Sequence, residues 1–295
     1  MKQVIHNPTA GKKHISKEEI VKALKDNGSE IAYISTEESG WEKFLESNPE
    51  IVYVAGGDGT VHKVATAIIN RESGTRNPKI HIVPTGTANN MAKSLNIPFG
   101  INSIKNIKGD RFKAIDYGKV KGLSAKHSFE SIGIGVFPAF VKEIKRMKKE
   151  GEPAGDLKQL IEKLVEKVTE FKPLKVKLKT ESFKISGSFL LVEIMNINYL
   201  GPNLHFAPSA ISNDGFFDLI MVPENRRREL ILYLEQLLNG KNGAFDAENF
   251  MLKLKLKEAR IKCKTNLVQI DDELDESFKN TMEIKVIPKT LNFCY

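Results

Sequence analysis

The chain has 295 residues, 41% of them hydrophobic and 28% charged, which suits one large or two ordinary globular domains. These proportions exclude a disordered, collagen-like or mucin-like chain, and no apolar run approaches the ~18 residues of a membrane-spanning helix. The net charge of +8 favours an anionic partner: a nucleotide, a nucleic acid or an anionic membrane surface. We expect no nucleic acid, because the basic residues are mixed with glutamate and lack the interleaved aromatic residues of an RNA-binding sheet.

The first residues, Met1–Pro8, leave no room for the apolar core of a signal peptide before the first turn, which predicts a cytosolic protein. The two cysteines, Cys263 and Cys294, are too few for a disulfide framework or a zinc site. We interpret both as ordinary thiols.

Strand and helix patterns alternate through residues 1–115. Helices are expected from Ser16, around Trp41, after Thr60 and after Thr87, and Ser16 and Glu19 have the spacing of a capping box. Such alternation predicts parallel pairing with right-handed crossovers, and therefore a Rossmann-like three-layer domain over residues 1–115. The expected strands are Gln3–His6, Ile31–Ser35, Ile51–Ala55 and Ile80–Val83.

Residues 116–295 show a different pattern, with strand following strand and few helices between them. This pattern predicts an antiparallel β-sandwich domain, with the last few residues as candidates for a return to the first domain. The expected helices are Pro138–Lys149, Gly155–Glu170 and Arg227–Leu238. The expected strands are Leu174–Lys179, Phe183–Met195, Phe217–Val222, Met251–Lys257, Arg260–Lys264, Asn266–Ile270 and Met282–Ile287.

The loop Gly56–Thr60 joins a buried strand to a helix, where glycines let backbone N–H groups approach a phosphate. The helix N-terminus adds a positive dipole, and Asp58 would repel phosphate unless a divalent cation lay between them. The loop therefore predicts a magnesium–nucleotide site. The alternative is a tight turn in which Asp58 caps the next helix.

Two more glycine-bearing loops, Asn7–Gly11 and Pro84–Asn90, follow the first and fourth predicted strands, and Thr36 ends the second. Since ligands bind at the carboxyl ends of parallel strands, three such loops on one rim favour a polyphosphate pocket. They match neither a P-loop nor a Gly-x-Gly-x-x-Gly fingerprint.

The motifs of these loops, in their order along the chain, resemble those of the diacylglycerol kinase catalytic-domain family. That family includes soluble bacterial lipid kinases and sphingosine and ceramide kinases. Three motifs resemble the family's nucleotide loops: Asn7-Pro8-x-x-Gly11-Lys12, Gly56-Gly57-Asp58-Gly59-Thr60 and Gly86-Thr87-x-Asn89. Later segments resemble its interdomain segment, its second-domain signature and its C-terminal Asp-Gly-Glu motif: Ile115–Gly118, Asn196–Ala210, Asn213–Asp218 and Val268–Glu273. The resemblance covers nearly the whole chain.

The resemblance implies a two-domain fold of the NAD kinase and diacylglycerol kinase type, with ATP and Mg²⁺ as cofactors. Asp58 and Asp116 match carboxylates that organise magnesium and its waters, and Glu273 matches the general base that accepts the lipid hydroxyl proton. A structural magnesium site is implied at Asp214 with the backbone oxygens of Ile211 and Phe216. The implied nucleotide-binding residues are Asn7, Pro8, Thr9, Ala10, Gly11, Thr36, Gly57, Asp58, Gly59, Thr60, Val61, His62, Lys63 and Thr87.

Three positions depart from the family pattern: Lys63 replaces an acid, Asn90 replaces the aspartate of an Asn-Asp pair, and Asp272 replaces the glycine of Asp-Gly-Glu. We expect an ATP-dependent kinase of a membrane lipid hydroxyl, with diacylglycerol as the default acceptor. Two alternatives stay open. One is an NAD kinase, and the other is a nucleotide-binding protein with weak or no kinase activity.

Two alternating lysine patterns, Lys175–Lys179 and Lys253–Lys257, are typical of solvated strand faces, with lysine guarding sheet edges. The functional alternative is a basic face that docks on anionic lipid, which the basic helix segment Lys142–Lys149 could join. Because the expected acceptor is a membrane lipid, we expect a cytosolic protein peripherally bound to an anionic membrane. The resemblance also implies a possible homodimer.

Overall fold

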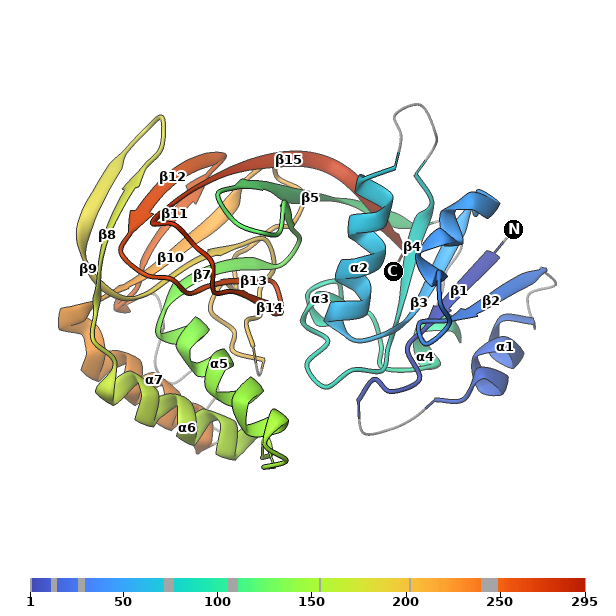
Figure 1. Cartoon of the computed structure of the whole chain (residues 1–295), viewed down its shortest axis with the longest axis horizontal. Coiled ribbons are helices and arrows are strands. Elements are labelled where there is room, and N and C mark those ends of the chain that lie inside the picture. Colours follow the sequence, from blue (N-terminus) through green and yellow to red (C-terminus); the bar gives the residue numbers. More distant parts are fainter. Residues whose placement is uncertain are drawn as a thin grey trace. The chain divides into compact units, whose positions relative to one another are not determined.

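A computed structural model describes residues 2–11, 15–25, 30–71, 77–105, 111–153, 155–201, 203–239 and 249–294. These residues form two compact units (Figure 1). The first unit contains the chain up to Tyr117 and the residues from Pro288 on, and the second contains Gly118–Ile287. Two strands, β5 (Phe112–Lys121) and β15 (Thr281–Cys294), contribute residues to both units.

The first unit is built on a parallel sheet in the order β2-β1-β3-β4, with the end of β15 beside β4 at Phe293 and Ile80. The central strand β3 is a continuous apolar run, as expected where both faces of a parallel sheet are covered. Val4, Val54 and Ile82 are all almost completely buried. The four strands are β1 (Lys2–His6), β2 (Ile31–Ser35), β3 (Ile51–Gly56) and β4 (Lys79–Pro84).

Helices connect these strands, and most begin where the sequence predicts. Ser16 and Glu19 form the expected capping box, with backbone-to-side-chain distances of 2.8 and 3.2 Å. The predicted second helix is a 3₁₀ segment, η1, bounded by Gly40 and Asn48 in left-handed conformations. The helical elements are α1 (Lys17–Lys25), η1 (Trp41–Ser47), α2 (Asp58–Ile69), α3 (Asn90–Ser94) and α4 (Asn102–Lys105).

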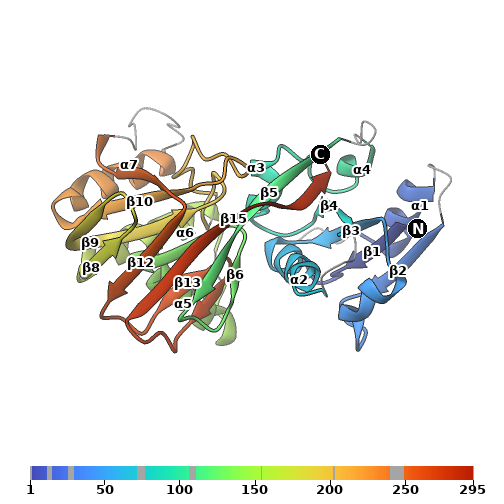
Figure 2. The ribbon, with the colours of Figure 1, turned by 90° about the horizontal axis from the view of Figure 1, so that it is seen from above.

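The second unit is antiparallel and rich in strands, in the order β14-β13-β7-β9-β8-β12-β15, with β10 pairing with β9 and β11 (Figure 2). Its inward positions form one apolar core that includes Ile132, Val176 and Ile261. The strands are β6 (His127–Ser128), β7 (Ser131–Gly135), β8 (Leu174–Lys179), β9 (Lys184–Met195), β10 (Phe217–Pro223), β11 (Leu252–Leu256), β12 (Glu258–Cys263), β13 (Val268–Ile270) and β14 (Glu273–Asp275).

A second apolar core of this unit joins helices to β9 and β10, and includes Phe137, Leu164, Leu190 and Leu234. The helical elements are α5 (Val136–Lys149), α6 (Leu157–Glu170), η2 (Glu224–Arg226) and α7 (Arg227–Leu238). The structure thus has the α/β unit and the antiparallel β-rich unit that the sequence predicts. None of the described helices combines the length and apolar character that crossing a bilayer requires.

Candidate functional site

Three strand-to-helix loops of the first unit meet at one edge of its sheet. The strands β1, β3 and β4 are parallel neighbours, so their carboxyl ends lie together. The Asn7 amide N–H donates to the Ala55 carbonyl at 2.8 Å, and the Asn7 side chain donates to Thr60 Oγ1 at 3.2 Å. The Thr85 N–H donates to the Gly56 carbonyl at 3.0 Å. The structure therefore brings the loops at Asn7, Gly56 and Thr85 into direct contact.

Glycine is required where these loops touch. Gly11 has φ +72°, and a Cβ there would lie 2.0 Å from the Thr85 carbonyl oxygen. A Cβ on Gly86 would lie 2.5 Å from the Gly57 Cα, which is backbone and cannot move aside cheaply. The glycines that the sequence suggests for phosphate approach thus also allow the three loops to pack on one another.

Asp58 links two of the loops. Its carboxylate accepts hydrogen bonds from the Asn90 N–H at 3.0 Å and the Met91 N–H at 3.2 Å, at the start of α3. The alternative expected from the sequence was that Asp58 caps the helix that follows it, whereas its observed backbone partners lie 32 and 33 residues further on. Because Asn90 makes this contact through its backbone, the contact does not depend on its side chain.

The other nucleotide-binding candidates divide by exposure. Thr9, Lys63 and Thr87 are exposed, while Val61 is almost completely buried, so only its backbone is available to a ligand. The Thr36 N–H donates to the His6 carbonyl at 2.8 Å, which holds Thr36 at the end of β1. The remaining candidates are half-buried: Pro8 and Ala10 in the first loop, and Gly59 and His62 in the N-terminal part of α2. Lys12 of the first motif lies outside the described residues.

Lys93, on α3, is a cation near this edge that the sequence reasoning missed. Burial lowers the pKa of Lys93, and the negative charge of Asp58 opposes that shift. The sequence shows that Lys93 follows the Gly86–Asn90 loop by three residues. Lys93 comes close to Asp58 only because of how α3 packs, which the sequence does not show.

Asp116 is fully buried in β5, and its Oδ1 accepts a hydrogen bond from the Lys289 N–H at 2.7 Å. Both residues belong to the first unit, where the chain returns through β15. The contact ties β5 to β15, so Asp116 has a structural role here. Its role beside magnesium stays a prediction.

The nucleotide-loop residues fit a magnesium ion that arrives with a polyphosphate. Among the described residues, no three His, Cys, Asp or Glu side chains cluster as metal ligands. Magnesium commonly uses one or two carboxylates together with substrate phosphates, and keeps several waters. The Asp58 carboxylate accepts two backbone hydrogen bonds, and an ionised carboxylate is the acceptor that such waters prefer.

The acidic turn of the second unit contains carboxylates in very different surroundings. Asp271, with φ 52°, is 3% exposed and accepts hydrogen bonds from Ser128 Oγ at 2.8 Å and from three backbone N–H groups. Those N–H groups belong to Phe129, Glu130 and Ser131. Asp271 is therefore a structural anchor for this loop.

Glu273, by contrast, has a side chain that is 62% exposed and lies 3.2 Å from the Lys145 ammonium of α5. Asp272 is also exposed. Of the three consecutive acids, the structure thus commits Asp271 to the fold and leaves Glu273 accessible, paired with one lysine.

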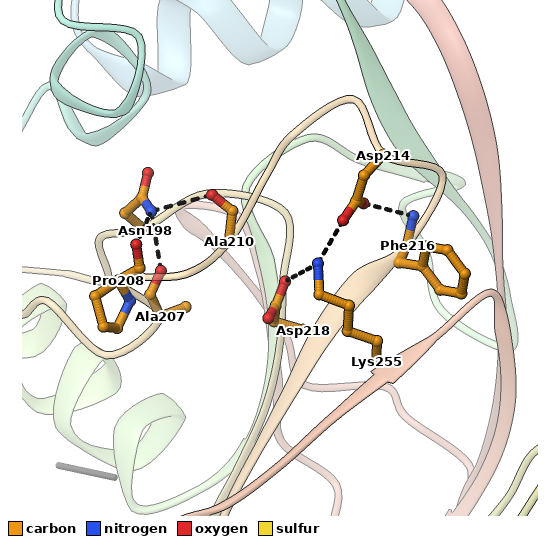
Figure 3. Close-up of polar contacts among 8 residues, drawn as sticks. All are labelled: Asn198, Ala207, Pro208, Ala210, Asp214, Phe216, Asp218 and Lys255. Atoms are coloured by element: carbon orange, nitrogen blue, oxygen red, sulfur yellow. Dashed lines mark hydrogen bonds and ion pairs between the residues drawn. The ribbon is translucent and has the colours of Figure 1, made fainter.

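The predicted structural metal site lies in the loop before β10 (Figure 3). Asp214 Oδ1 accepts from the Phe216 N–H at 3.0 Å, and Asp214 Oδ2 contacts the Lys255 ammonium. Lys255 stands directly across from Asp218 in the β10–β11 pair, with 4.0 Å between its ammonium and Asp218 Oδ2. As arranged, this loop does not fit Mg²⁺, because the Lys255 ammonium holds the carboxylate that would be the charged ligand.

The pKa shifts agree with this ion pair. The hydrogen bond to Asp214 raises the pKa of Lys255. Burial raises the pKa of Asp218, and the charge of Lys255 opposes that shift. Nearby, the Asn198 amide donates to the carbonyls of Ala207, Pro208 and Ala210 and orders the segment that leads into the loop (Figure 3).

The sequence matches the diacylglycerol kinase catalytic domain over residues 2–120, and the YegS C-terminal NAD kinase beta sandwich-like domain over residues 144–295. A protein from Klebsiella pneumoniae (strain 342) named "Probable lipid kinase YegS-like" is 31% identical over 207 residues, which are 68% of this chain and 67% of the relative.

Solved structures show the same fold. A diacylglycerol kinase from Bacillus anthracis strain Sterne superimposes with a TM-score of 0.73 at 20% identity, over 100% of this chain and 96% of that one. An NAD kinase from Archaeoglobus fulgidus in complex with ATP gives a TM-score of 0.56 at 11% identity, over 100% and 94% of the chains. These likenesses concern the fold alone, and with the sandwich-domain match they confirm the predicted fold class.

Proposed function

The chain belongs to the lipid kinase family that carries a diacylglycerol kinase catalytic domain and a YegS-type C-terminal domain, and we propose that it phosphorylates diacylglycerol. ATP would be the donor, magnesium its counter-ion, and phosphatidic acid the product. The observation that carries the proposal is the junction of three glycine-bearing loops at the carboxyl edge of β1, β3 and β4.

The first unit would hold the nucleotide mainly through its backbone. The Gly57–Thr60 segment starts α2, so its N–H groups and the helix dipole favour a phosphate. The exposed side chains of Lys63 and Lys93 add positive charge near the same edge. Bound magnesium would neutralise charge on the phosphates, and phosphoryl transfer depends chiefly on such neutralisation and on positioning.

The second unit would supply the proton acceptor. A bond forms between the acceptor hydroxyl oxygen and the γ-phosphorus while the bond to the bridging oxygen of ADP breaks. The hydroxyl proton passes to the Glu273 carboxylate, whose exposed side chain can reach a substrate once it exchanges Lys145 for the hydroxyl.

The substrate places the protein at a membrane. Diacylglycerol is a membrane lipid, so we propose a cytosolic protein that binds the bilayer peripherally. The implied homodimer stays a prediction.

The test is to incubate the protein with labelled ATP and a total lipid extract, and then to identify the labelled product. Labelled phosphatidic acid supports the proposal, and a different labelled lipid would redirect it to another acceptor. NAD is assayed in parallel, because labelled NADP would identify an NAD kinase. ATP binding without turnover on any acceptor would point to a nucleotide-binding protein, which Lys63 and Asn90 motivate.

A further inference from the structure

One surface of the second unit concentrates positive charge. Alternate positions of β8 and β12, such as Val176 and Ile261, point into the apolar core, so the residues between them point outward. The strands β9, β8, β12 and β15 are consecutive neighbours in the sheet (Figure 2). We name the exposed basic residues of this surface the basic face: Lys119, Lys121, Lys175, Lys177, Lys179, Lys184, Arg260, Lys262, Lys264 and Lys285.

Three overlapping hollows connect these residues. All ten basic side chains line them, against three acidic ones, Glu181, Glu258 and Glu283. The excess of basic over acidic residues on this surface is nearly as large as the net charge of +8 of the whole chain. No aromatic side chain is among the described residues that line the hollows.

The strand register brings like charges together. Lys177 stands directly across from Lys262, and Lys179 lies between Arg260 on one side and Lys184 on the other. Like charges in direct cross-strand positions destabilise a sheet. Within the described part of the chain, the only ion pair of the basic face joins Arg260 to Glu283, at 3.7 Å.

The other basic segments of this unit are neutralised differently. On α5, Lys142 pairs with Glu276 at 2.7 Å and Lys145 with Glu273 at 3.2 Å. On β11, whose partner among the described strands is β10, Lys255 contacts Asp214. The two lysine patterns of the sequence thus differ: the pattern on β8 lies within a surface of like charge, whereas Lys255 at the centre of the other pattern is paired with an acid.

We propose that the basic face docks the protein on a membrane rich in anionic phospholipid. This proposal rests on the proposed function, because it assumes that the acceptor is a membrane lipid. Each lysine or arginine near an anionic bilayer strengthens binding by about fivefold, which is ~1 kcal/mol. A second copy of the chain would present the same positive charge and be repelled. A nucleic acid that is bound without sequence preference usually needs aromatic side chains for base stacking, which these hollows lack.

The test compares wild type with a triple variant, Lys177→Gln, Lys179→Gln and Lys262→Gln, by sedimentation with vesicles. Wild type should bind vesicles of phosphatidylcholine mixed with phosphatidylserine, bind pure phosphatidylcholine weakly, and lose binding as salt is raised. The triple variant should bind the mixed vesicles about 100-fold more weakly. Its midpoint of thermal unfolding should equal or exceed that of wild type, because the substitutions remove repulsion between strands.

The matched control is Lys22→Gln, Lys25→Gln and Lys43→Gln, which removes the same charge from exposed positions of the first unit. It should bind vesicles within a fewfold of wild type. Equal binding by the two triple variants, or equal wild-type binding to charged and neutral vesicles, would overturn the proposal. So would RNA that displaces wild type from mixed vesicles at physiological salt, since it would assign the face to nucleic acid.

Sedimentation needs neither ATP nor turnover, so its result stands even if the proposed kinase activity is absent. If that activity is present, both triple variants should phosphorylate diacylglycerol in uncharged detergent micelles at the wild-type rate. Only the basic-face variant should lose activity on diacylglycerol in anionic vesicles. Retained activity of the basic-face variant on anionic vesicles would overturn the docking role in catalysis.

Discussion

Asp58 and Glu273, the leading candidate carboxylates of the two units, are held in opposite ways. Asp58 accepts two backbone hydrogen bonds that join one loop to another, whereas Glu273 contacts a single lysine and is largely exposed. A carboxylate that organises backbone cannot be changed without changing the site around it. A carboxylate paired only at the surface contributes little to folding, so its removal reports on chemistry alone.

The sharpest test of this difference is Glu273→Gln. The amide keeps the size of the side chain but cannot take the proton of the lipid hydroxyl. A positioned general base contributes about 10²–10⁴-fold to a rate. Turnover should therefore fall by that factor while ATP affinity and thermal stability stay close to wild type. Steady-state kinetics, ATP titration and a thermal melt measure the three quantities. Unchanged turnover would remove Glu273 from the chemistry and leave Asp272 to test, since Asp271 is committed to the fold.

Asp58→Asn should affect both activity and structure. Loss of one charge contact to the transition state commonly costs 10²–10³-fold, judged from the removal of oxyanion-hole donors. The asparagine oxygen can still accept one of the two N–H groups, so the free energy of unfolding should fall by only about 1 kcal/mol. Turnover at saturating magnesium and a denaturant titration test the two parts. A wild-type rate at saturating magnesium would contradict the assignment.

Glu193 extends the comparison to a carboxylate without a partner. It lies on β9, is completely buried, and neither carboxylate oxygen has a hydrogen-bond partner among the described residues. Burial raises the pKa of Glu193 well above its ordinary value. The folded protein then keeps this proton while the unfolded chain releases it above pH ~4.3, so Glu193 costs more stability as the pH rises from there towards its folded pKa.

Glu193→Met, which replaces the acid by an apolar side chain of similar length, should therefore stabilise the protein at pH 8 more than at pH 5. The difference in unfolding free energy between variant and wild type should grow by up to about 1.4 kcal/mol per pH unit. Denaturant unfolding curves of both proteins across this pH range measure the difference. Protonation of the groups that the two proteins share affects both equally and cancels. A difference that does not change with pH would mean that Glu193 is ionised in the folded state.

The smallest expected effect concerns Lys255. Since its ammonium already neutralises Asp214, magnesium should change the melting temperature of wild type very little. In Lys255→Met the Asp214 carboxylate and nearby backbone oxygens become available to a cation. Magnesium at ten times its dissociation constant would then stabilise the variant by about 1.4 kcal/mol.

Adding Asp214→Asn to the Lys255→Met variant should abolish that gain, which separates a bound ion from a general salt effect. A magnesium-dependent rise in the melting temperature of wild type would instead show that the ion displaces the lysine. That result would support the metal site that the resemblance implies at Ile211, Asp214 and Phe216.

Local patterns predicted most of the fold and only part of the site. The alternation in Leu174–Lys179 predicted β8 with its correct bounds, and the periodicity of Arg227–Leu238 did the same for α7. The strands β14 and β5 were missed. Three residues give no period to detect in β14, and the apolar residues Phe112, Ile115 and Val120 of β5 do not keep an alternating spacing.

The contacts that distinguish one acid from another are long-range. Asp58 meets Asn90 across 32 residues, Lys255 meets Asp214 across 41, and Lys145 meets Glu273 across 128. No spacing rule connects such pairs, because tertiary packing brings them together. The sequence could therefore name Asp58 from its glycine loop and Glu273 through resemblance, but it could not show which acid is buried, which is hydrogen-bonded to backbone and which is paired with a lysine.

The path of β15 determines when the sheet of the first unit can be completed during synthesis. The sheet of the first unit ends at β4, and the strand that pairs with that edge comes from Phe293 and Cys294. Residues made after the whole second unit thus close a sheet whose other strands were made before that unit. Until then the β4 edge offers unpaired N–H and C=O groups to any other strand, which is a known route to misassembly. The nascent chain is therefore most vulnerable to aggregation before Phe293 and Cys294 leave the ribosome.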